Sequence, residues 1–387
     1  NIIDPLEITE RYGTDAVRMA MLQGAAPGTD IILTEERVLA ARAFANKIWN
    51  AARFIFLNME RSGVAPWLPR ERAPRRPEAS DGGPCLEDRW IFSRLNACAF
   101  ETSSALTRYR YHEAAQLLWQ FFWHEFCDWY LEIKKLRLRE NSGLNADWRN
   151  LLTVFESALR LLHPVMPFIT EELWQRLTDG CAGQPLSIAL APYPAEDPNA
   201  CDARAEGDMG LLQEIVTSAR NLRADLKLDP KQRSEAVLYA RDEPAALALR
   251  EHEAIEKLAN VSFSVLEQPA PSEVEGVLRS TTEFDLLLRV PAAQLEAQRQ
   301  RAAKETGHLE KLVEGSRRQL ADETFLARAP AQVVSALRAK LADYEAQLAK
   351  AQETLARLCR STENTRRFWR RSAAPWMKTS ARATSLL

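Results

Sequence analysis

A run of apolar residues near the carboxyl end constrains the fold of this chain more than any other feature. The run alternates steps of three and four without a miss at Val334, Leu337, Leu341, Tyr344, Leu348, Ala351, Leu355 and Leu358. This spacing is the a/d seam of a coiled coil, which has to be buried against another helix. A weaker seam precedes it, beyond a break that contains Pro330, at Leu295, Ala302, Leu309, Leu312 and Leu320.

We therefore predict an antiparallel coiled-coil hairpin arm over residues 291–358. Each helix would be about 40 Å long, because about 28 residues rise by 1.5 Å each. The alternative is a helix pair that lies on the body of the protein. The tail, residues 359–387, has seven Lys or Arg residues, one acidic residue and no core-forming period. It is either a basic, disordered extension or a stretch outside the native reading frame, and we assign it no function.

The rest of the chain also has mainly helical periodicity. Because 387 residues exceed what one compact core holds, we expect roughly two to four domains. We predict a mainly α fold with a helical bundle over residues 34–200, in which residues 61–86 are a loop or linker rich in Pro, Arg and Gly. A small α/β subdomain should follow over residues 201–290, before the arm.

Several elements can be placed within these ranges. Residues 5–33 predict two helices separated by a turn at Gly13, the second capped by Thr14. A long helix should start near Thr34, with a buried stripe at Val38, Ala41, Ala45, Ile48, Ala52, Ile55 and Met59. Helical pattern resumes at Glu87 and runs to about Leu177, with a boundary marked by Pro164 and Pro167.

Residues 109–140 carry many aromatic side chains, which suggests a helix with neighbours on more than one side, as in the middle of a bundle. In the α/β subdomain we expect two helices and three strands, at residues 211–226, 236–240, 246–258, 261–266 and 283–290.

No catalytic signature occurs in the sequence. It has no glycine-rich nucleotide loop, no nucleophile elbow and no HExxH motif, and its five histidines are dispersed. The six cysteines form no CxxC pair, so we predict neither a zinc site nor a disulfide framework. The sequence contains no run of 18 apolar residues, so we predict no membrane-spanning helix. The net charge of −2 excludes a globally basic surface, so any polyanion would have to bind a local patch.

One such patch is expected on the helix that starts near Thr34. Arg42, Asn46, Asn50 and Arg53 lie at helical spacing opposite the buried stripe, with Lys47 and Phe54 beside them. Asn and Arg can hydrogen-bond unstacked bases, and a phenyl ring can stack on one. From the residues alone, an ordinary solvated polar face is the simpler interpretation.

Two further groups of basic residues allow two interpretations each. Lys134, Lys135, Arg137 and Arg139 either complement the carboxyl end of a helix or meet phosphate. On the arm, basic residues cluster toward the tip at Lys311, Arg317, Arg318, Arg328, Arg338 and Lys340, together with the acids Asp322 and Glu323. Mixed charge of this kind either only solubilises a coiled coil or, as a group, contacts phosphate.

The sequence resembles the valyl-tRNA synthetases, which are class I aminoacyl-tRNA synthetases. Residues 1–60 resemble the segment that follows their K-M-S-K-S signature, through "YGTDAVRMAML", "APGTDI", "TEERV" and "FANKIWNAARF". Further similar stretches are "DRWIFSRLN", "FFWHEFCDWYLEIKK", "LLHPVMPFITEELWQRL", "SIALAPYP", "SARNLRADL" and "FLARAP". Together they cover about residues 1–358 in order.

This resemblance implies a division of labour. The full-length enzyme would use ATP and magnesium to attach valine to its tRNA, and would edit mischarged threonyl-tRNA, in catalytic and editing domains that precede residue 1. Residues 1–33 would be the end of the catalytic region or a connecting segment. The chain itself would need no cofactor and would not catalyse alone. Its helical domain would recognise the anticodon through Arg42, Asn46, Lys47, Asn50, Arg53 and Phe54. The basic residues of its arm would, as a group, contact phosphate at the outer corner of the tRNA.

The expected partners are therefore the tRNA for valine and the catalytic and editing domains of the same polypeptide. We expect a cytoplasmic monomer without a membrane partner. The competing hypothesis is a stand-alone interaction scaffold that dimerises through its coiled coil.

Overall fold

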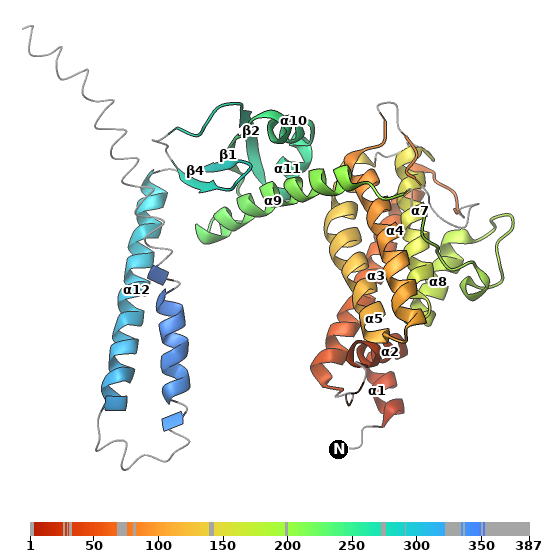
Figure 1. Cartoon of the computed structure of the whole chain (residues 1–387), viewed down its shortest axis with the longest axis horizontal. Helices are drawn as coiled ribbons and strands as arrows, with labels where there is room; N and C mark the ends of the chain where they lie inside the picture. Colours follow the sequence, from red (N-terminus) through yellow and green to blue (C-terminus); the bar gives the residue numbers. More distant parts are fainter. Residues whose placement is uncertain are drawn as a thin grey trace, which may run out of the picture. The chain divides into compact units, whose positions relative to one another are not determined.

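The computed structural model describes residues 4–25, 28, 30, 33–67, 76–79, 83–138, 143–197, 200–271, 276–290, 292–321, 334–335, 337–349 and 351–352. The chain divides into two compact units, residues 1–210 and 211–387 (Figure 1). Across these described ranges, no helix combines the length and apolar character that crossing a lipid bilayer requires.

The first unit is a bundle of helices (Figure 1). In chain order these are α1 (Pro5–Tyr12), α2 (Thr14–Gly24), α3 (Glu35–Ser62), α4 (Leu86–Thr107), α5 (Tyr111–Trp119), η1 (Gln120–Tyr130), α6 (Leu131–Arg137), α7 (Ala146–Leu162), α8 (Pro167–Thr178) and the short η2 (Ile188–Leu190). Helix α4 packs against α5 and α7, and α3 packs against α2 and α8. Helix α9 (Ala203–Asp225) begins in this unit and ends in the second.

Helix α3 forms as its end signals predict. The Thr34 hydroxyl accepts a hydrogen bond from the backbone N–H of Arg37, and Glu35 and Glu36 occupy the first turn. The helix stops at Gly63, whose φ of 65° few other residues adopt readily. The predicted stripe is buried except at Ala45, which is only half-buried. Its place in the core is taken by Phe44, whose ring stacks on Trp119 at 4.4 Å between centroids.

The aromatic-rich stretch is one continuous helix whose middle part is a π-helix. Helices α5, η1 and α6 follow one another without a break in helical backbone. The predicted packing on more than one side is confirmed: Phe122 meets Phe44 of α3, and Phe126 meets Phe155 of α7. The π-helix, which is rare at this length, was not predicted because the sequence has no pattern specific to it.

The motif "YGTDAVR" holds α2 against the proline-rich boundary before α8. The Asp15 carboxylate accepts hydrogen bonds from the backbone N–H of Phe168 (3.3 Å) and of Ile169 (2.7 Å), and so caps α8 from another helix. Arg18 donates to the carbonyl oxygens of Pro164 and Val165. The predicted N-cap was wrong by one residue, since Gly13 is the N-cap of α2 and Thr14 its first residue.

The second unit contains a four-stranded sheet in the order β2-β1-β4-β3. The strands are β1 (Ser234–Tyr239), β2 (Val261–Leu266), β3 (Val277–Ser280) and β4 (Asp285–Arg289). β1 is parallel to β2 and antiparallel to β4, which is in turn antiparallel to β3. Two helices, α10 (Asp242–Arg250) and α11 (His252–Ala259), make the crossover that a parallel pair requires.

Two predictions for this sheet unit were wrong in detail. The single helix expected at residues 246–258 is two helices, which meet at Glu251. β3 was not predicted, because it has only four residues. Gly276 precedes it at φ 140°, and a Cβ there would clash with the carbonyl oxygen of Leu288. The glycine therefore lets β3 approach β4.

The arm is an antiparallel helical pair, as predicted. It consists of α12 (Ala292–Ala321) and the helical residues described between 334 and 352. Arg317 pairs with Glu345 at 2.6 Å, and Gln352 pairs with Glu310 at 3.4 Å. Moving seven residues back along α12, from 317 to 310, thus corresponds to moving seven residues forward along the second helix, from 345 to 352, so the helices are antiparallel. The mainly α fold class, with its bundle, small α/β unit and hairpin, is confirmed.

The seam of the second arm helix is as predicted where it is described: Val334, Leu337, Leu341, Tyr344, Leu348 and Ala351 are all half-buried. Leu355 and Leu358 lie outside the described residues. The seam of α12 was only partly predicted. Among the α12 side chains that the structure describes, Thr306, Leu309, Val313 and Ser316 are buried and Leu312 and Leu320 are half-buried, while the side chains of Leu295 and Ala302 lie outside the description. Two of the buried residues are polar, which hid the three-four spacing.

Candidate nucleic-acid interface

The polar face predicted on α3 is an exposed ridge. Arg42, Asn46, Asn50 and Arg53, here called the α3 ridge, are all solvent-exposed, while Lys47 and Phe54 at its edge are half-buried. Because these positions are three or four residues apart, their side chains lie along one face of the helix. Helix α3 itself is fixed by the buried stripe beneath, so the ridge is presented on a rigid support.

On one edge of the ridge, Lys47 is held by its neighbours. Its ammonium lies 2.8 Å from the carboxylate of Asp128 and 5.6 Å from the ring centroid of Trp123, both on η1. Partial burial tends to lower the pKa of Lys47, but the hydrogen bond and charge of Asp128 outweigh it and raise the pKa. Lys47 is therefore charged but already paired, so a phosphate would have to compete with Asp128.

Phe54 lies on the same edge and is partly covered. The ammonium of Lys135 on α6 is 5.1 Å from its ring centroid, and Lys135 also pairs with Glu132 at 2.5 Å. A cation over a ring at this distance is an attractive contact. The half-buried ring leaves less surface for a base than the sequence suggested.

The other edge of the ridge carries a pair that sequence reasoning missed. Trp49 is 41% exposed, and the Arg176 guanidinium of α8 lies 5.3 Å from its ring centroid. Trp49 follows Asn46 by three residues and precedes Arg53 by four, so the same spacing argument could have included it. Its partner could not be found this way, because Arg176 is distant in sequence.

The basic group at the end of the aromatic helix divides into two kinds. Lys134 is fully buried, which excludes the phosphate interpretation for this residue. Lys135 is exposed, and Arg137 pairs with the buried Glu87 at 3.2 Å. Arg139 lies outside the described residues. Of the three residues in this group that the structure describes, Lys135 is the exposed one and stays a candidate for phosphate contact.

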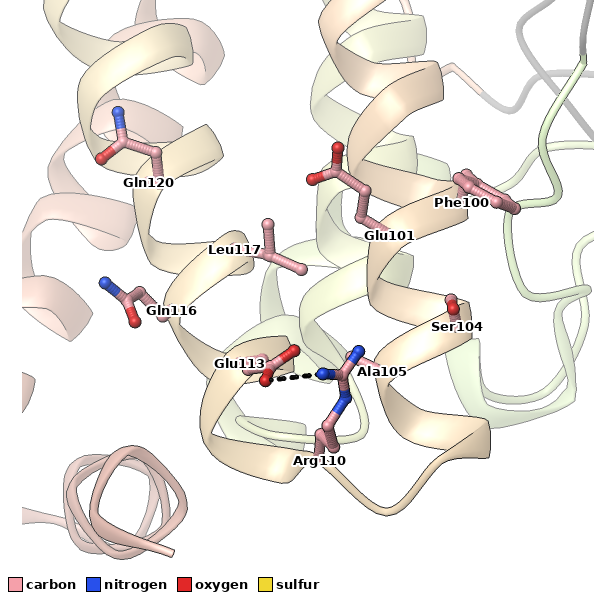
Figure 2. Close-up of a pocket in the computed structure, with 9 residues that line it drawn as sticks. All are labelled: Phe100, Glu101, Ser104, Ala105, Arg110, Glu113, Gln116, Leu117 and Gln120. Atoms are coloured by element: carbon pink, nitrogen blue, oxygen red, sulfur yellow. Dashed lines mark ion pairs between the residues drawn. The ribbon is translucent and has the colours of Figure 1, made fainter. Parts of the chain in front are cut away.

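A hollow lies between α4 and α5 (Figure 2). It has a volume of about 460 Å³ and is lined by Phe100, Glu101, Ser104, Ala105, Arg110, Glu113, Gln116, Leu117 and Gln120. Figure 2 shows Arg110 beside Glu113, with which it pairs at 3.1 Å. These nine residues include no histidine or cysteine, and we assign no function to the hollow.

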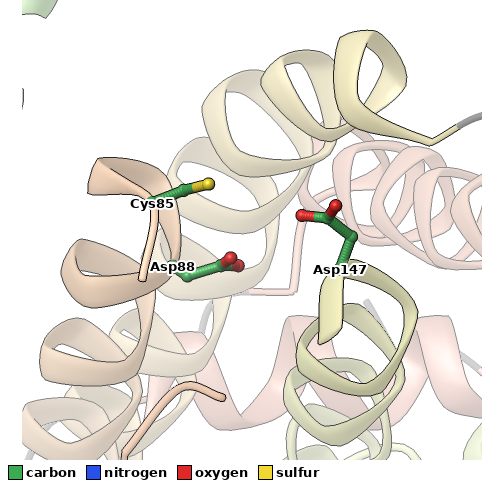
Figure 3. Close-up of side chains that lie close together, drawn as sticks. All are labelled: Cys85, Asp88 and Asp147. Atoms are coloured by element: carbon green, nitrogen blue, oxygen red, sulfur yellow. The ribbon is translucent and has the colours of Figure 1, made fainter. Parts of the chain in front are cut away.

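Cys85, Asp88 and Asp147 gather at the start of α4 and α7, with ligand atoms within 4.8 Å of one another (Figure 3). This cluster has the donor atoms of a cation site. However, the Lys134 ammonium lies 2.7 Å from Asp88 and 2.6 Å from Asp147, and so supplies the positive charge itself. The cluster is therefore a structural link between α4, α6 and α7.

Hydrogen bonds complete this link. The Tyr130 hydroxyl and the Asn150 amide both donate to the Asp88 carboxylate, at 2.7 and 3.1 Å. Burial raises the pKa of Asp88 to about 6 although Lys134 opposes the shift, and the Glu87 carboxylate adds to it. The carboxylates around Lys134 outweigh its burial and raise its pKa, so it stays protonated.

The basic residues predicted on the arm are exposed where they are described. Lys311, Arg317, Arg318, Arg338 and Lys340 all face solvent, and Arg328 lies outside the described residues. Arg317 pairs with Glu345 across the hairpin, and Arg318 with Glu314 along α12. Exposed pairs of this kind contribute little stability, so both arginines can exchange partners at small cost.

Comparison with known families gives two matches. Residues 88–238 match the family described as the anticodon-binding domain of tRNA ligase, and residues 294–359 match the valyl tRNA synthetase tRNA binding arm. The α3 ridge precedes the first match, but the residues that flank it on η1, α6 and α8 lie within it. The bundle and the arm thus define the chain as an anticodon-binding and arm region of the tRNA ligases.

Individual relatives show which family of tRNA ligases the chain belongs to. A valine–tRNA ligase of Solibacter usitatus is 54% identical over 350 residues, which are 90% of this chain and 38% of the relative. Those of Dehalococcoides mccartyi and Geobacter sulfurreducens are 38% and 36% identical, each over 89% of this chain and 38% of the relative. The chain belongs to the valine–tRNA ligase family, of which it represents a C-terminal portion. It spans less than two-fifths of the length of these relatives.

Proposed function

We propose that this chain is the tRNA-binding part of a valine–tRNA ligase and recognises the anticodon through the α3 ridge. The observation that carries the proposal is the ridge itself. Four exposed Arg and Asn side chains stand on a helix whose opposite face is buried, and a cation lies over an aromatic ring at either edge. The amides and guanidinium groups can hydrogen-bond the edges of unstacked bases, and arginine can also pair with phosphate.

The arm has a different part in this proposal. Its exposed Lys311, Arg317, Arg318, Arg338 and Lys340, together with Arg328 of the sequence, would contact backbone phosphates at the outer corner of the tRNA. Such contacts add affinity without reading sequence. The proposal keeps the predicted domain boundaries, which fall after residues 33, 200, 290 and 358.

The chemistry belongs to the whole enzyme. A full-length ligase would use ATP and magnesium to attach valine to its tRNA and would edit mischarged threonyl-tRNA, with domains of the same polypeptide that this chain does not contain. We assign no catalytic residue here, and propose that the enzyme is a cytoplasmic monomer.

Binding of tRNA transcripts in a nitrocellulose filter assay tests the proposal. The chain should prefer a transcript with a valine anticodon over the same transcript with another anticodon, and binding should weaken as salt is raised. Equal binding of the two transcripts at moderate salt would refute anticodon recognition. The substitution Asn50→Ala should reduce the preference, because it removes hydrogen-bonding groups from the ridge.

The scaffold hypothesis is less well supported. It needs the coiled-coil seam to be available for a second chain, whereas Arg317–Glu345 and Gln352–Glu310 join the two helices within one chain. Light scattering distinguishes the two: the tRNA-binding proposal expects a monomer, and the scaffold a dimer.

A further inference from the structure

Trp49 and Arg176 form an open stack at the edge of the α3 ridge. Trp49 is 41% exposed, although a large aromatic side chain gains free energy when it is buried. The guanidinium of Arg176 covers part of it at 5.3 Å from the ring centroid. The two residues come from α3 and α8, which both belong to the first unit.

The guanidinium also pairs with a neighbour on its own helix. Its Nη2 and Nε atoms lie 2.6 and 2.8 Å from one carboxylate oxygen of Glu172, one helical turn earlier on α8. This exposed pair contributes little stability, but it favours the orientation in which the guanidinium lies over the ring. The planar cation and the exposed ring together offer a surface for another flat group, because guanidinium and indole both stack on aromatic rings.

We propose that Trp49 and Arg176 bind one unpaired nucleobase of the RNA whose neighbouring bases lie on the α3 ridge. The inference rests on the proposed function and adds a stacking site to it. Continuity argues for this occupant: Trp49 is three residues from Asn46 and four from Arg53, so the stack and the hydrogen-bonding ridge are adjoining surfaces of one helix face.

The chemistry of the site also favours a base. Single-stranded RNA is commonly bound by stacking its bases on aromatic rings and arginine planes, while polar groups nearby read their edges. The site is tolerant of base identity, since every base has a flat face. The Trp49–Arg176 site would therefore position the anticodon loop, while the Asn and Arg residues of the α3 ridge would discriminate between base sequences.

The experiment uses the full chain and a synthetic anticodon stem-loop with the valine anticodon. A fluorescent purine analogue, whose emission falls on stacking, replaces the loop bases one at a time. We expect quenching at one loop position on binding, and loss of that quenching with Arg176→Gln or Trp49→Ala. Affinity should fall about tenfold, within the range for removing one stacked base.

Three variants keep the test specific. Arg176→Lys retains the charge but not the plane, so it should behave like Arg176→Gln. Trp49→Phe retains an aromatic ring and much of the packing of the tryptophan side chain, so it should preserve quenching. It is therefore the control for misfolding of Trp49→Ala. Arg108→Gln removes an exposed arginine at the end of α4 and should bind as the wild type does.

The outcomes separate this inference from the proposed function. Unchanged quenching and affinity in Arg176→Gln and Trp49→Ala, alongside weakened binding by Arg53→Ala, would refute the stacking site and leave the ridge intact. Wild-type affinity in Arg176→Lys would refute stacking and leave only a charge effect. If the wild type binds no stem-loop at all, the proposed function fails as well.

Discussion

At the scale of single residues, Lys134 makes the largest difference between sequence and structure. Its position at the basic end of a helix suggested a surface cation, yet it is fully buried among Asp88, Asp147 and Glu87. The sequence could not reveal this, because the carboxylates come from α4 and α7. Trp49 is the opposite case. Its helical spacing from the α3 ridge could be read from the sequence, but its exposure to solvent could not.

Replacing Lys134 should strongly destabilise the first unit. Lys134→Met leaves buried carboxylates without their counter-charge, which typically costs about 3–5 kcal/mol. Lys135→Met removes an exposed pair with Glu132 and should cost less than about 1 kcal/mol. Urea unfolding followed by circular dichroism measures both. Equal stability of the two variants would contradict the structural role of the buried cluster.

The Asp88 carboxyl should give the stability of the fold a distinctive pH dependence. Its pKa is about 6 in the folded chain against an ordinary value of 3.8, so between these values the folded state holds a proton that the unfolded state releases. Stability from this group therefore falls as pH rises from about 4 to 6, by on the order of 2–3 kcal/mol. Asp88→Asn should lack this component. Parallel stability curves for wild type and variant would argue against it.

At the scale of elements, regular patterns were predicted well and irregular ones were not. The heptad seam at residues 334–351 and the stripe of α3 repeat every three or four residues, and both face a neighbouring helix as expected. The π-helix η1 and the short strand β3 depend on tertiary packing and on the close approach at Gly276, which no local pattern records. Of the candidate interface, the ridge was predictable from periodicity, but its flanks on η1, α6 and α8 required the fold.

The cap that Asp15 provides to α8 is a testable link between two elements. Asp15→Ala leaves the backbone N–H groups of Phe168 and Ile169 without their acceptor, and should cost about 1–2 kcal/mol, as loss of a helix cap does. Asp15→Asn keeps an acceptor oxygen and should cost less. Thermal unfolding of the three proteins provides the comparison, and an Asn variant as unstable as the Ala variant would show that charge matters more than the hydrogen bond.

At the scale of the whole molecule, the two units are expected to contribute different kinds of binding. The ridge presents groups that can hydrogen-bond base edges, whereas the exposed cations of the arm can pair with phosphate but carry no sequence information. The net charge of −2 means that neither effect comes from a global field. Affinity and preference for one tRNA should therefore be separable by mutation.

Neutralising the arm should weaken the binding of all tRNAs alike. With Lys311, Arg317, Arg318, Arg338 and Lys340 changed to Gln, fewer counterions are released on binding. The slope of log affinity against log salt should therefore become shallower by about 0.7–0.9 for each phosphate that the arm no longer neutralises. The ratio between the affinities for valine tRNA and for other tRNAs should not change. Arg53→Ala in the ridge should instead reduce that ratio, and should change the slope by no more than the value for a single phosphate. An arm variant that loses the preference but keeps the slope would mean that the arm, and not the ridge, reads the tRNA.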